Sequence, residues 1–394
     1  MLLNSLLKPF VKPLAVLSAF AIAGWSHAAA PTADELDSIF AARGIVYQQD
    51  DDGGKGGNPT IEEHATIYEG ILLFQQRLND NNAASLKAVG DLVTAASYDD
   101  ARDKAETVSG ATGYNPGRFN FEGRWKHRTE SRTGFTLFAS YGQEFAYRST
   151  GYGFGLSQSL NEESTQLSAD VQFYDDTVRM IRYDGSKETD EPRDTTSSAF
   201  SVTQTLTPVS LINASWVYSE QRGMLATSFN SILLDNGQRE FEILPDERIR
   251  NTFSVRYKHA IKSDSVQLGA SYYKDNWGIM GRALEARYFY HLSDGKLTLE
   301  PSYRFYTQSA SHYFQQQFQG PRVNPQTDQA TRLYQTSDSD LGSFDGHSAG
   351  LTLSYFTAGW LTKEPSNYDI GFNVYRRSDE LHFYWLTLGW YTKL

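Results

Sequence analysis

The chain has 394 residues, of which 40% are hydrophobic and 14% are aromatic, and its formal net charge is -11 at pH 7. It contains no cysteine, which excludes disulfides, thiolate metal sites, covalent haem attachment and iron–sulfur clusters. The acidic balance makes nucleic acid an unsuitable partner.

The first 28 residues have the pattern of a secretory signal peptide. Lys8 and Lys12 give a positive start, residues 14–24 form a short apolar run, and Ser26-His27-Ala28 is a small-x-small cleavage site. The apolar run is too short to cross a bilayer as a helix. We therefore expect export, with a signal peptide over residues 1–28.

Residues 29–41 are predicted to form a short periplasmic lead-in, a helix capped by Thr32 with Glu35 three positions later. Residues 42–394 are assigned to one barrel domain. Within it, residues 62–78 fit both a helix and a strand, and the strand is favoured because a polar turn and renewed alternation follow. A helical periplasmic domain over residues 33–110 is the alternative.

The clearest pattern lies in residues 250–308. Phe253 and Val255 share one face of a strand, whereas Arg256 and Lys258 share the other. Three further segments repeat this alternation, separated by short polar connections. Apolar and polar residues that alternate over segments of about ten residues are typical of a transmembrane β-barrel, although soluble sandwiches alternate too.

These segments and similar ones elsewhere predict an all-β, antiparallel transmembrane barrel of about 16 strands, within a range of 14–18. Outside residues 250–308, strands are expected at 44–49, 62–78, 86–94, 119–126, 135–141, 148–160, 164–178, 196–207, 210–221, 346–360, 368–378 and 381–394. Long extracellular loops are expected at 98–116, 179–195, 222–248 and 309–345. Both chain ends then lie on the side of the short periplasmic turns.

The last strand carries a second signal. Apolar residues alternate up to the carboxyl terminus, with Thr392 as a polar break: Tyr384, Leu386, Leu388, Trp390 and Leu394. This resembles the strand that the barrel-assembly machinery of Gram-negative bacteria recognises, with Leu394 in place of the usual Phe. The pattern predicts the cell outer membrane of a Gram-negative bacterium, with outer-membrane lipid and the assembly machinery as partners.

Four stretches resemble the uncharacterised bacterial family called domain of unknown function 3570. They are residues 272–279 (YYKDNWGI), 303–314 (YRFYTQSASHYF), 336–344 (TSDSDLGSF) and 108–116 (VSGATGYNP). Asp340 departs from the basic residue expected at its position. The resemblance implies an outer-membrane barrel and hints at a periplasmic redox protein as a partner, and it supplies no catalytic residues to carry over.

Charged side chains alternate with the apolar ones and are therefore predicted to face the inside of the barrel. They are Glu122, Arg124, Lys126, Arg256, Lys258, Glu285, Arg287, Glu300 and Arg304. Such residues form cross-strand ion pairs, and in a barrel of this size they also line a water-filled path. The sequence thus predicts a porin-like channel for small solutes, with a non-conducting structural or docking barrel as the alternative.

Three further groups of residues are candidate sites. Trp277, in a short outer connection, is predicted to anchor at the lipid–water interface, with stacking on a ligand as the alternative. Asp338, Asp340, Asp345 and His347 have carboxylates suited to calcium, but the order of a calcium loop is missing, so no metal or other cofactor is expected. Ser309, Ser311 and His312 suggest a hydrolase only weakly, because no nucleophile motif accompanies them, and no enzyme is predicted.

Overall fold

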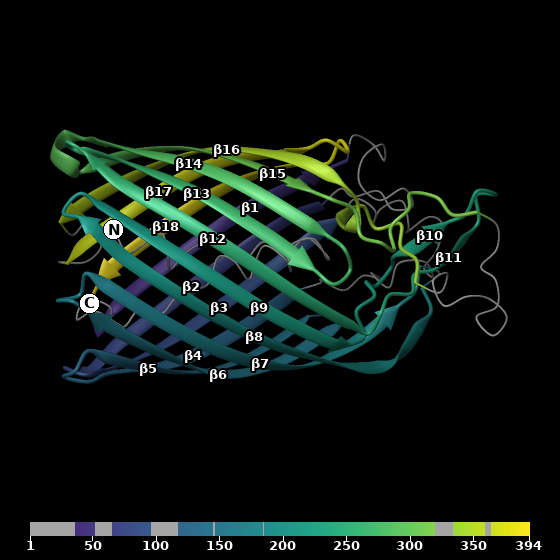
Figure 1. Cartoon of the computed structure of the whole chain (residues 1–394), viewed down its shortest axis with the longest axis horizontal. Coiled ribbons are helices and arrows are strands. Elements are labelled where there is room, and N and C mark those ends of the chain that lie inside the picture. Colours follow the sequence, from purple (N-terminus) through teal and green to yellow (C-terminus); the bar gives the residue numbers. More distant parts are fainter. Residues whose placement is uncertain are drawn as a thin grey trace.

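The computed structural model describes residues 36–51, 65–95, 117–144, 146–183, 185–319, 334–358 and 364–394. The predicted signal peptide, most of the lead-in and the loop at 98–116 lie outside these ranges. Within them, sixteen antiparallel strands close into one barrel (Figure 1). The predicted fold class and strand number are confirmed. Among the described residues, no helix is long and apolar enough to cross a membrane.

The barrel strands follow one another around the wall in chain order, and the first pairs with the last. They are β1 (Ile39–Asp50), β2 (Ala65–Asn79), β3 (Asn82–Ala95), β4 (Gly117–Arg128), β5 (Thr133–Glu144), β6 (Tyr147–Leu160), β7 (Thr165–Ile181), β8 (Lys187–Thr207), β9 (Ser210–Gly223), β12 (Glu247–Ile261), β13 (Asp264–Asp275), β14 (Met280–Leu292), β15 (Leu297–Gln308), β16 (Phe344–Ala358), β17 (Pro365–Arg377) and β18 (His382–Lys393). A small separate sheet contains β10 (Ser231–Leu233) and β11 (Arg239–Phe241), and two short 3-10 turns are η3 (Ser293–Gly295) and η5 (Ser339–Leu341).

Two expectations near the N-terminus are settled by strand pairing. Residues 65–95 form β2 and β3, so the helical alternative is wrong over that stretch. The barrel begins at Ile39, inside the segment assigned to the lead-in, because Ile39 pairs with Lys393 on one side and Gln75 on the other. A strand paired on both sides satisfies its backbone hydrogen bonds.

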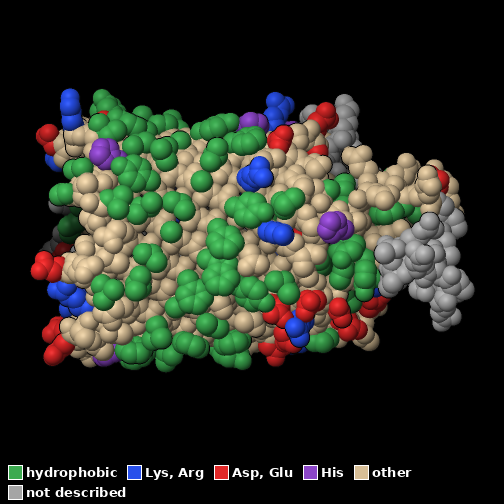
Figure 2. Space-filling model, in the orientation of Figure 1, with side chains coloured by type: hydrophobic (Ala, Val, Ile, Leu, Met, Phe, Trp, Pro, Cys, Tyr) green, Lys and Arg blue, Asp and Glu red, His purple; other side chains and the backbone are tan. Residues whose placement is uncertain are grey.

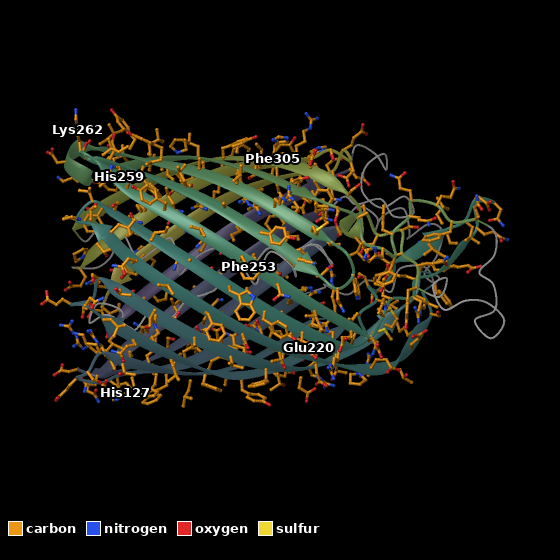
Figure 3. All side chains as sticks on the ribbon, in the orientation of Figure 1. His127, Glu220, Phe253, His259, Lys262 and Phe305 are labelled. Atoms are coloured by element: carbon orange, nitrogen blue, oxygen red, sulfur yellow. The ribbon has the colours of Figure 1, made fainter. Side chains whose placement is uncertain are left out.

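The two ends of the barrel differ as predicted. Both ends of the described chain, Leu36 and Leu394, lie at one rim, where the connections are short. Lys262 marks a turn of that rim in Figure 3. The opposite rim carries the long connections and the β10–β11 sheet. The prediction of a loop at 179–195 is wrong in part, because β8 already begins at Lys187. Its first residues are charged and mostly exposed on both faces, so they show no alternation that would have indicated a strand.

The outer face of the barrel is apolar. Large hydrophobic side chains point outward along the strands, and Leu284, for example, is 62% exposed. Figure 2 shows hydrophobic side chains across the visible wall, with acidic and basic ones gathered at the left rim and toward the right end. Phe253 lies partway along this wall in Figure 3. An apolar band that surrounds a closed barrel matches the hydrocarbon of a bilayer.

The inner face combines charged residues with a few apolar clusters. On the wall made by β18, β1, β2 and β3, Ile45, Ile71 and Val89 pack together, with Trp385 against them. Nearer the long-loop rim, Tyr47, Ile67 and Phe383 form a second cluster with Leu381. These residues alternate with outward apolar ones, so parts of this wall are apolar on both faces.

A charge placed on the outer face is expected to destabilise the barrel far more than the same charge on the inner face. Leu351 lies at the middle of β16 and is exposed outward, whereas Thr352 faces inward and is paired with Glu300 across the strands. Leu351→Arg should cost about 2–4 kcal/mol in lipid, because the guanidinium meets hydrocarbon. The measurement is reversible unfolding in bilayer vesicles, with Thr352→Arg as the control. Equal losses in both variants would contradict the assignment of faces.

Candidate functional site

The charged residues predicted to face inward all lie on the face opposite the exposed apolar side chains. The largest group spans β12, β14 and β15. Arg287 is its centre: its Nε donates to Glu285 Oε1 at 2.5 Å, and its Nη1 donates to Glu300 Oε1 at 3.2 Å. Lys258 lies over the Phe289 ring at 4.2 Å. Charge-assisted contacts of this kind offset the desolvation penalty of placing several ions on one wall.

A second charged group lies on the opposite wall. Glu122, Arg124 and Lys126 are on β4, which is eight places from β14 in the sixteen-strand order and therefore faces it across the barrel. Arg124 Nε donates to Glu122 Oε1 at 2.6 Å, and the guanidinium lies 5.1 Å from the centre of the Phe138 ring. Charged groups thus occupy two facing walls of the barrel.

Several inward charges near this second group were not among the residues predicted from the sequence. Arg118 donates to Asp91, and the same guanidinium lies 3.5 Å from Glu69 Oε2. Both carboxylates are buried on neighbouring strands, β2 and β3. The signal was present, because Asp91 lies between the outward residues Gly90 and Leu92, but the assignment of this region to strands was uncertain.

A further missed pair joins the two ends of the chain. Arg43 Nη2 on β1 donates to Asp369 Oδ2 on β17 at 3.0 Å, across the intervening strand β18. The residue of β18 between them is Gly389, which is paired with both. A Cβ at Gly389 would collide with the Asp369 carboxylate, so the glycine makes room for the ion pair.

At the long-loop rim, segments 223–247, 275–280, 309–319 and 334–343 pack together into a folded unit, here called the outer cap. Isolated β-bridges join Leu234 to Phe318, Ile243 to Gln335 and Phe314 to Thr336. The described parts of the long loop predicted at 309–345 therefore pack against the loop predicted at 222–248.

Trp277 is the buried centre of the outer cap. It is only 2% exposed and packs with Tyr273, Ile279 and Leu341. Its indole Nε1 donates to the Glu247 carbonyl at 2.9 Å. The prediction of an interfacial anchor is wrong, and so is ligand stacking, because Arg248 lies 4.4 Å above the ring and Tyr313 meets it edge-on.

Asp275 holds the Trp277 turn in place. Its Oδ1 accepts hydrogen bonds from the backbone N–H of Trp277 at 3.1 Å and of Ile279 at 2.8 Å. Its Oδ2 accepts two from Arg248, at 3.0 and 2.7 Å, and one from the Tyr273 hydroxyl at 2.9 Å. Every lone pair of this carboxylate is thus occupied by groups of the chain.

The candidate calcium ligands either bond to other groups of the chain or lie on the outer face of the barrel. Asp338 Oδ1 accepts from the Asp340 N–H at 3.0 Å, and its Oδ2 accepts from Asn230 at 2.9 Å. Asp340 Oδ1 accepts from Arg377 at 2.6 Å. Asp345 and His347 are exposed on the outward face of β16. Among the described residues, no group of three acidic or histidine side chains could hold a metal ion.

Two carboxyl groups of the outer cap sit in unusual surroundings. Burial raises the pKa of Asp340 to about 7, and the charge of Asp338 acts in the same direction, while Arg377 opposes both. Burial also raises the pKa of Glu242. Glu242 accepts from the Thr336 hydroxyl at 2.5 Å and from the Thr227 N–H at 3.0 Å, which ties the two long loops together.

The serines considered for hydrolysis also serve the outer cap. The Ser309 hydroxyl donates to the Gly278 carbonyl at 3.2 Å, and the Ser311 hydroxyl donates to the Trp277 carbonyl at 3.1 Å. In the hydrogen bonds of the described chain, neither hydroxyl contacts a histidine ring. The two serines fix the chain that carries His312 against the Trp277 turn.

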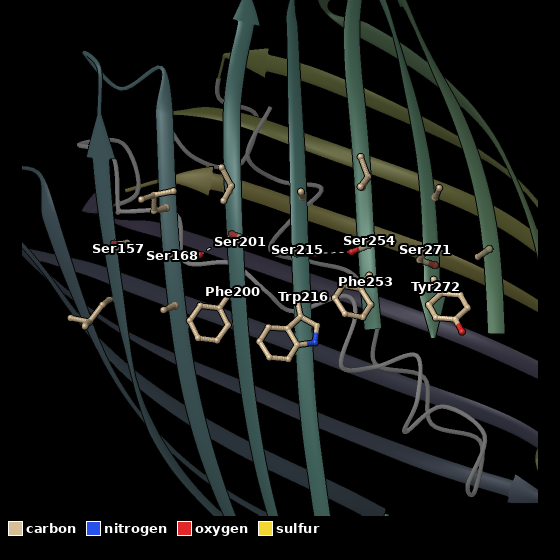
Figure 4. Close-up of a pocket in the computed structure, with 18 of the residues that line it drawn as sticks. Ser157, Ser168, Phe200, Ser201, Ser215, Trp216, Phe253, Ser254, Ser271 and Tyr272 are labelled. Atoms are coloured by element: carbon tan, nitrogen blue, oxygen red, sulfur yellow. Dashed lines mark hydrogen bonds between the residues drawn. The ribbon is translucent and has the colours of Figure 1, made fainter. Parts of the chain in front are cut away.

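A hollow of about 1390 Å³ follows the wall from β5 to β15, but it lies on the outside (Figure 4). Its apolar lining consists of outward side chains, including the stacked rings of Phe200, Trp216 and Phe253. The serines that accompany them, such as Ser215 and Ser254, bond to each other on the inner side at 2.6 Å. This hollow therefore faces the surroundings of the barrel and is no part of a path through it.

A family model described as Protein of unknown function (DUF3570) matches residues 14–384. No curated protein matches the sequence. Among solved structures, a bacterial polysaccharide outer membrane secretin is 9% identical, with 91% of this chain and 98% of that chain covered and a TM-score of 0.45. Pseudomonas aeruginosa OccK1 (OpdK) is 10% identical, with coverage of 91% and 98% and a TM-score of 0.44.

A third similar structure is Pseudomonas aeruginosa OccK2 (OpdF) in complex with glucuronate. It is 9% identical, with 91% of this chain and 96% of that chain covered and a TM-score of 0.42. At these identities and scores, the likeness concerns the fold and carries no argument about function. The function has to be argued from the faces of this barrel.

Proposed function

We propose that this chain, which belongs to the family described as Protein of unknown function (DUF3570), is an outer-membrane channel for small polar or charged solutes. The observation that carries the proposal is the contrast between the two faces of the wall. The outer face is apolar and suits lipid, whereas the inner face carries ion pairs on opposite walls, centred on Arg287 and Arg124. Charged inner walls are expected in contact with water.

The direction of insertion follows from the rims. The short-turn rim, which holds both ends of the described chain, is assigned to the periplasm, and the outer cap to the cell exterior. Outer-membrane lipid surrounds the wall, and the assembly machinery recognises β18, whose outward residues include Tyr384, Leu386 and Leu388. The proposal assigns the chain no catalytic role and no cofactor.

Planar-bilayer recording of the refolded residues 29–394 tests the proposal. A channel gives stepwise currents that rise in proportion to salt concentration. A barrel whose electrophoretic migration changes on heating but that passes no current would contradict the proposal and would favour a second candidate, a docking barrel.

The folded outer cap is the feature that favours this second candidate, because loops built around a buried tryptophan present a fixed surface. Co-purification of a periplasmic redox protein with a silent barrel would instead identify a partner that meets the short-turn rim, on the side opposite the outer cap.

A further inference from the structure

One arginine on the inner wall is buried with two of its nitrogens unpartnered in the described chain. Arg250, on β12, is 6% exposed, and its Nε and Nη1 have no hydrogen-bond acceptor among the residues that the structure describes. It faces inward, because it alternates with outward residues such as Phe253 along the strand. A buried guanidinium without an acceptor is costly, so its retention needs an explanation.

The carboxylates around Arg250 already have arginine partners, although Asp176 Oδ1 accepts no hydrogen bond among the described residues. The nearest across the strands is Asp275, whose two oxygens accept from Arg248, Tyr273 and two backbone N–H groups. Asp176 accepts from Arg193 at 3.2 Å. Arg193 and Arg248 act on Arg250 as like charges, and Asp275 partly offsets them. Three arginines therefore share two aspartates, which leaves one positive charge uncompensated.

A second unpartnered group lies beside this charge. Ser219 is the strand partner of Arg250 on β9, it faces inward, and it is 1% exposed. Its hydroxyl also has no hydrogen-bond partner in the described part of the chain. Guanidinium N–H groups and a hydroxyl that lack an acceptor, on paired residues of one face, form a set of donors for an oxyanion.

The position of this set fits a solute that enters from outside. Arg250 is the fourth residue of β12 counted from the rim of the outer cap. Since the excess is a single positive charge, a monoanion balances it, and the two oxygens of a carboxylate can accept from one guanidinium N–H and from the neighbouring hydroxyl. Ionisable groups inside a membrane protein mark solute pathways by default.

We propose that Arg250 and Ser219 form a binding site for the carboxylate of a small organic anion on the inner wall, near the extracellular rim. The proposal deepens the proposed function and rests on it for the entry of the anion. Arg250 supplies the charge and an N–H donor that is unpartnered among the described residues. Ser219 adds one hydroxyl donor, and Arg193 and Arg248 add long-range attraction.

Acetate is the probe, and its equilibrium binding to the detergent-solubilised barrel is measured by saturation-transfer NMR. Arg250→Met should reduce the affinity for acetate by on the order of tenfold or more, because a charge-assisted hydrogen bond is lost. Arg250→Lys should lose less, because it keeps the charge without the fork. The control is Lys274→Gln, which removes one positive charge from the outward face of the adjacent strand.

The thermal midpoint of the same variants separates a binding role from a structural one. Removal of an uncompensated buried charge should leave Arg250→Met at least as stable as the natural chain. Lower stability with unchanged acetate affinity would overturn the proposal, and so would an equal loss of affinity in Lys274→Gln. Currents without acetate binding would reject the site and leave the channel, whereas binding without currents would reject the channel and leave the site.

Discussion

Trp277→Ala is expected to destabilise the outer cap by about 3–5 kcal/mol while the barrel wall stays folded. The indole is almost fully buried between Tyr273, Ile279 and Leu341, and alanine would leave a cavity at the point where four chain segments meet. The lost indole N–H also leaves the Glu247 carbonyl without its donor. The loss should therefore be felt in every segment of the outer cap.

Hydrogen exchange measures this effect directly. The N–H of His312 bonds to the Trp277 carbonyl at 2.9 Å, and the N–H of Gln335 bonds to the Ile243 carbonyl at 2.9 Å. Both amides should exchange roughly 100-fold faster or more in the variant, since each 1.4 kcal/mol is a factor of ten. Trp216→Ala, on the outer wall, is the control and should leave these rates unchanged. Unchanged rates in Trp277→Ala would show that the residue does not hold the outer cap.

Arg377→Ala is expected to cost a similar amount, about 3–5 kcal/mol, because it leaves buried carboxylates without their cation. The Arg377 side chain is 0% exposed. It donates to Asp340 at 2.6 Å, to Asp379 at 2.9 and 2.5 Å and to the Ser339 carbonyl at 3.1 Å. Its guanidinium also lies 3.8 Å from the centre of the Phe344 ring.

The neighbouring residue supplies a matched control. Arg376 precedes Arg377 on β17 but is exposed on the outward face, so Arg376→Ala should have little effect. Exchange of the Leu341 and Gly342 amides, which close the short turn η5, reports the difference. Arg377→Lys should be intermediate, because one ammonium cannot replace a fork that serves three acceptors. Similar exchange in both alanine variants would contradict this role of Arg377.

The wall of the barrel could be predicted because the alternation of apolar and polar residues within each strand indicates the two faces of that strand. Alternation in β12 or β18 depends only on neighbouring residues, so the faces of Phe253 and Leu388 follow from the sequence. The charged residues of the inner wall were found by the same argument. Their partners were not, because an ion pair such as Arg43 with Asp369 joins residues 326 positions apart.

The outer cap could not be predicted in this way. The residues around Trp277 in the chain are polar or small, which favoured a surface position. Its actual neighbours come from distant segments and include Leu225, Tyr313 and Leu341. Whether a residue at such a point is buried depends on how the long loops pack together. No local alternation of residues indicates this packing. Arg250 was missed for the same reason, since the absence of an acceptor becomes visible only when all strand partners are known.

Thiol labelling during bilayer recording tests the central claim, that one face of this wall meets lipid and the other meets water. The chain contains no cysteine, so single substitutions report alone. On β13, Gln267 faces inward and Leu268 faces outward. A charged, water-soluble methanethiosulfonate should lower the current of Gln267→Cys in irreversible steps and leave Leu268→Cys unchanged. Modification of Leu268→Cys in the bilayer, or an inert Gln267→Cys, would contradict the account.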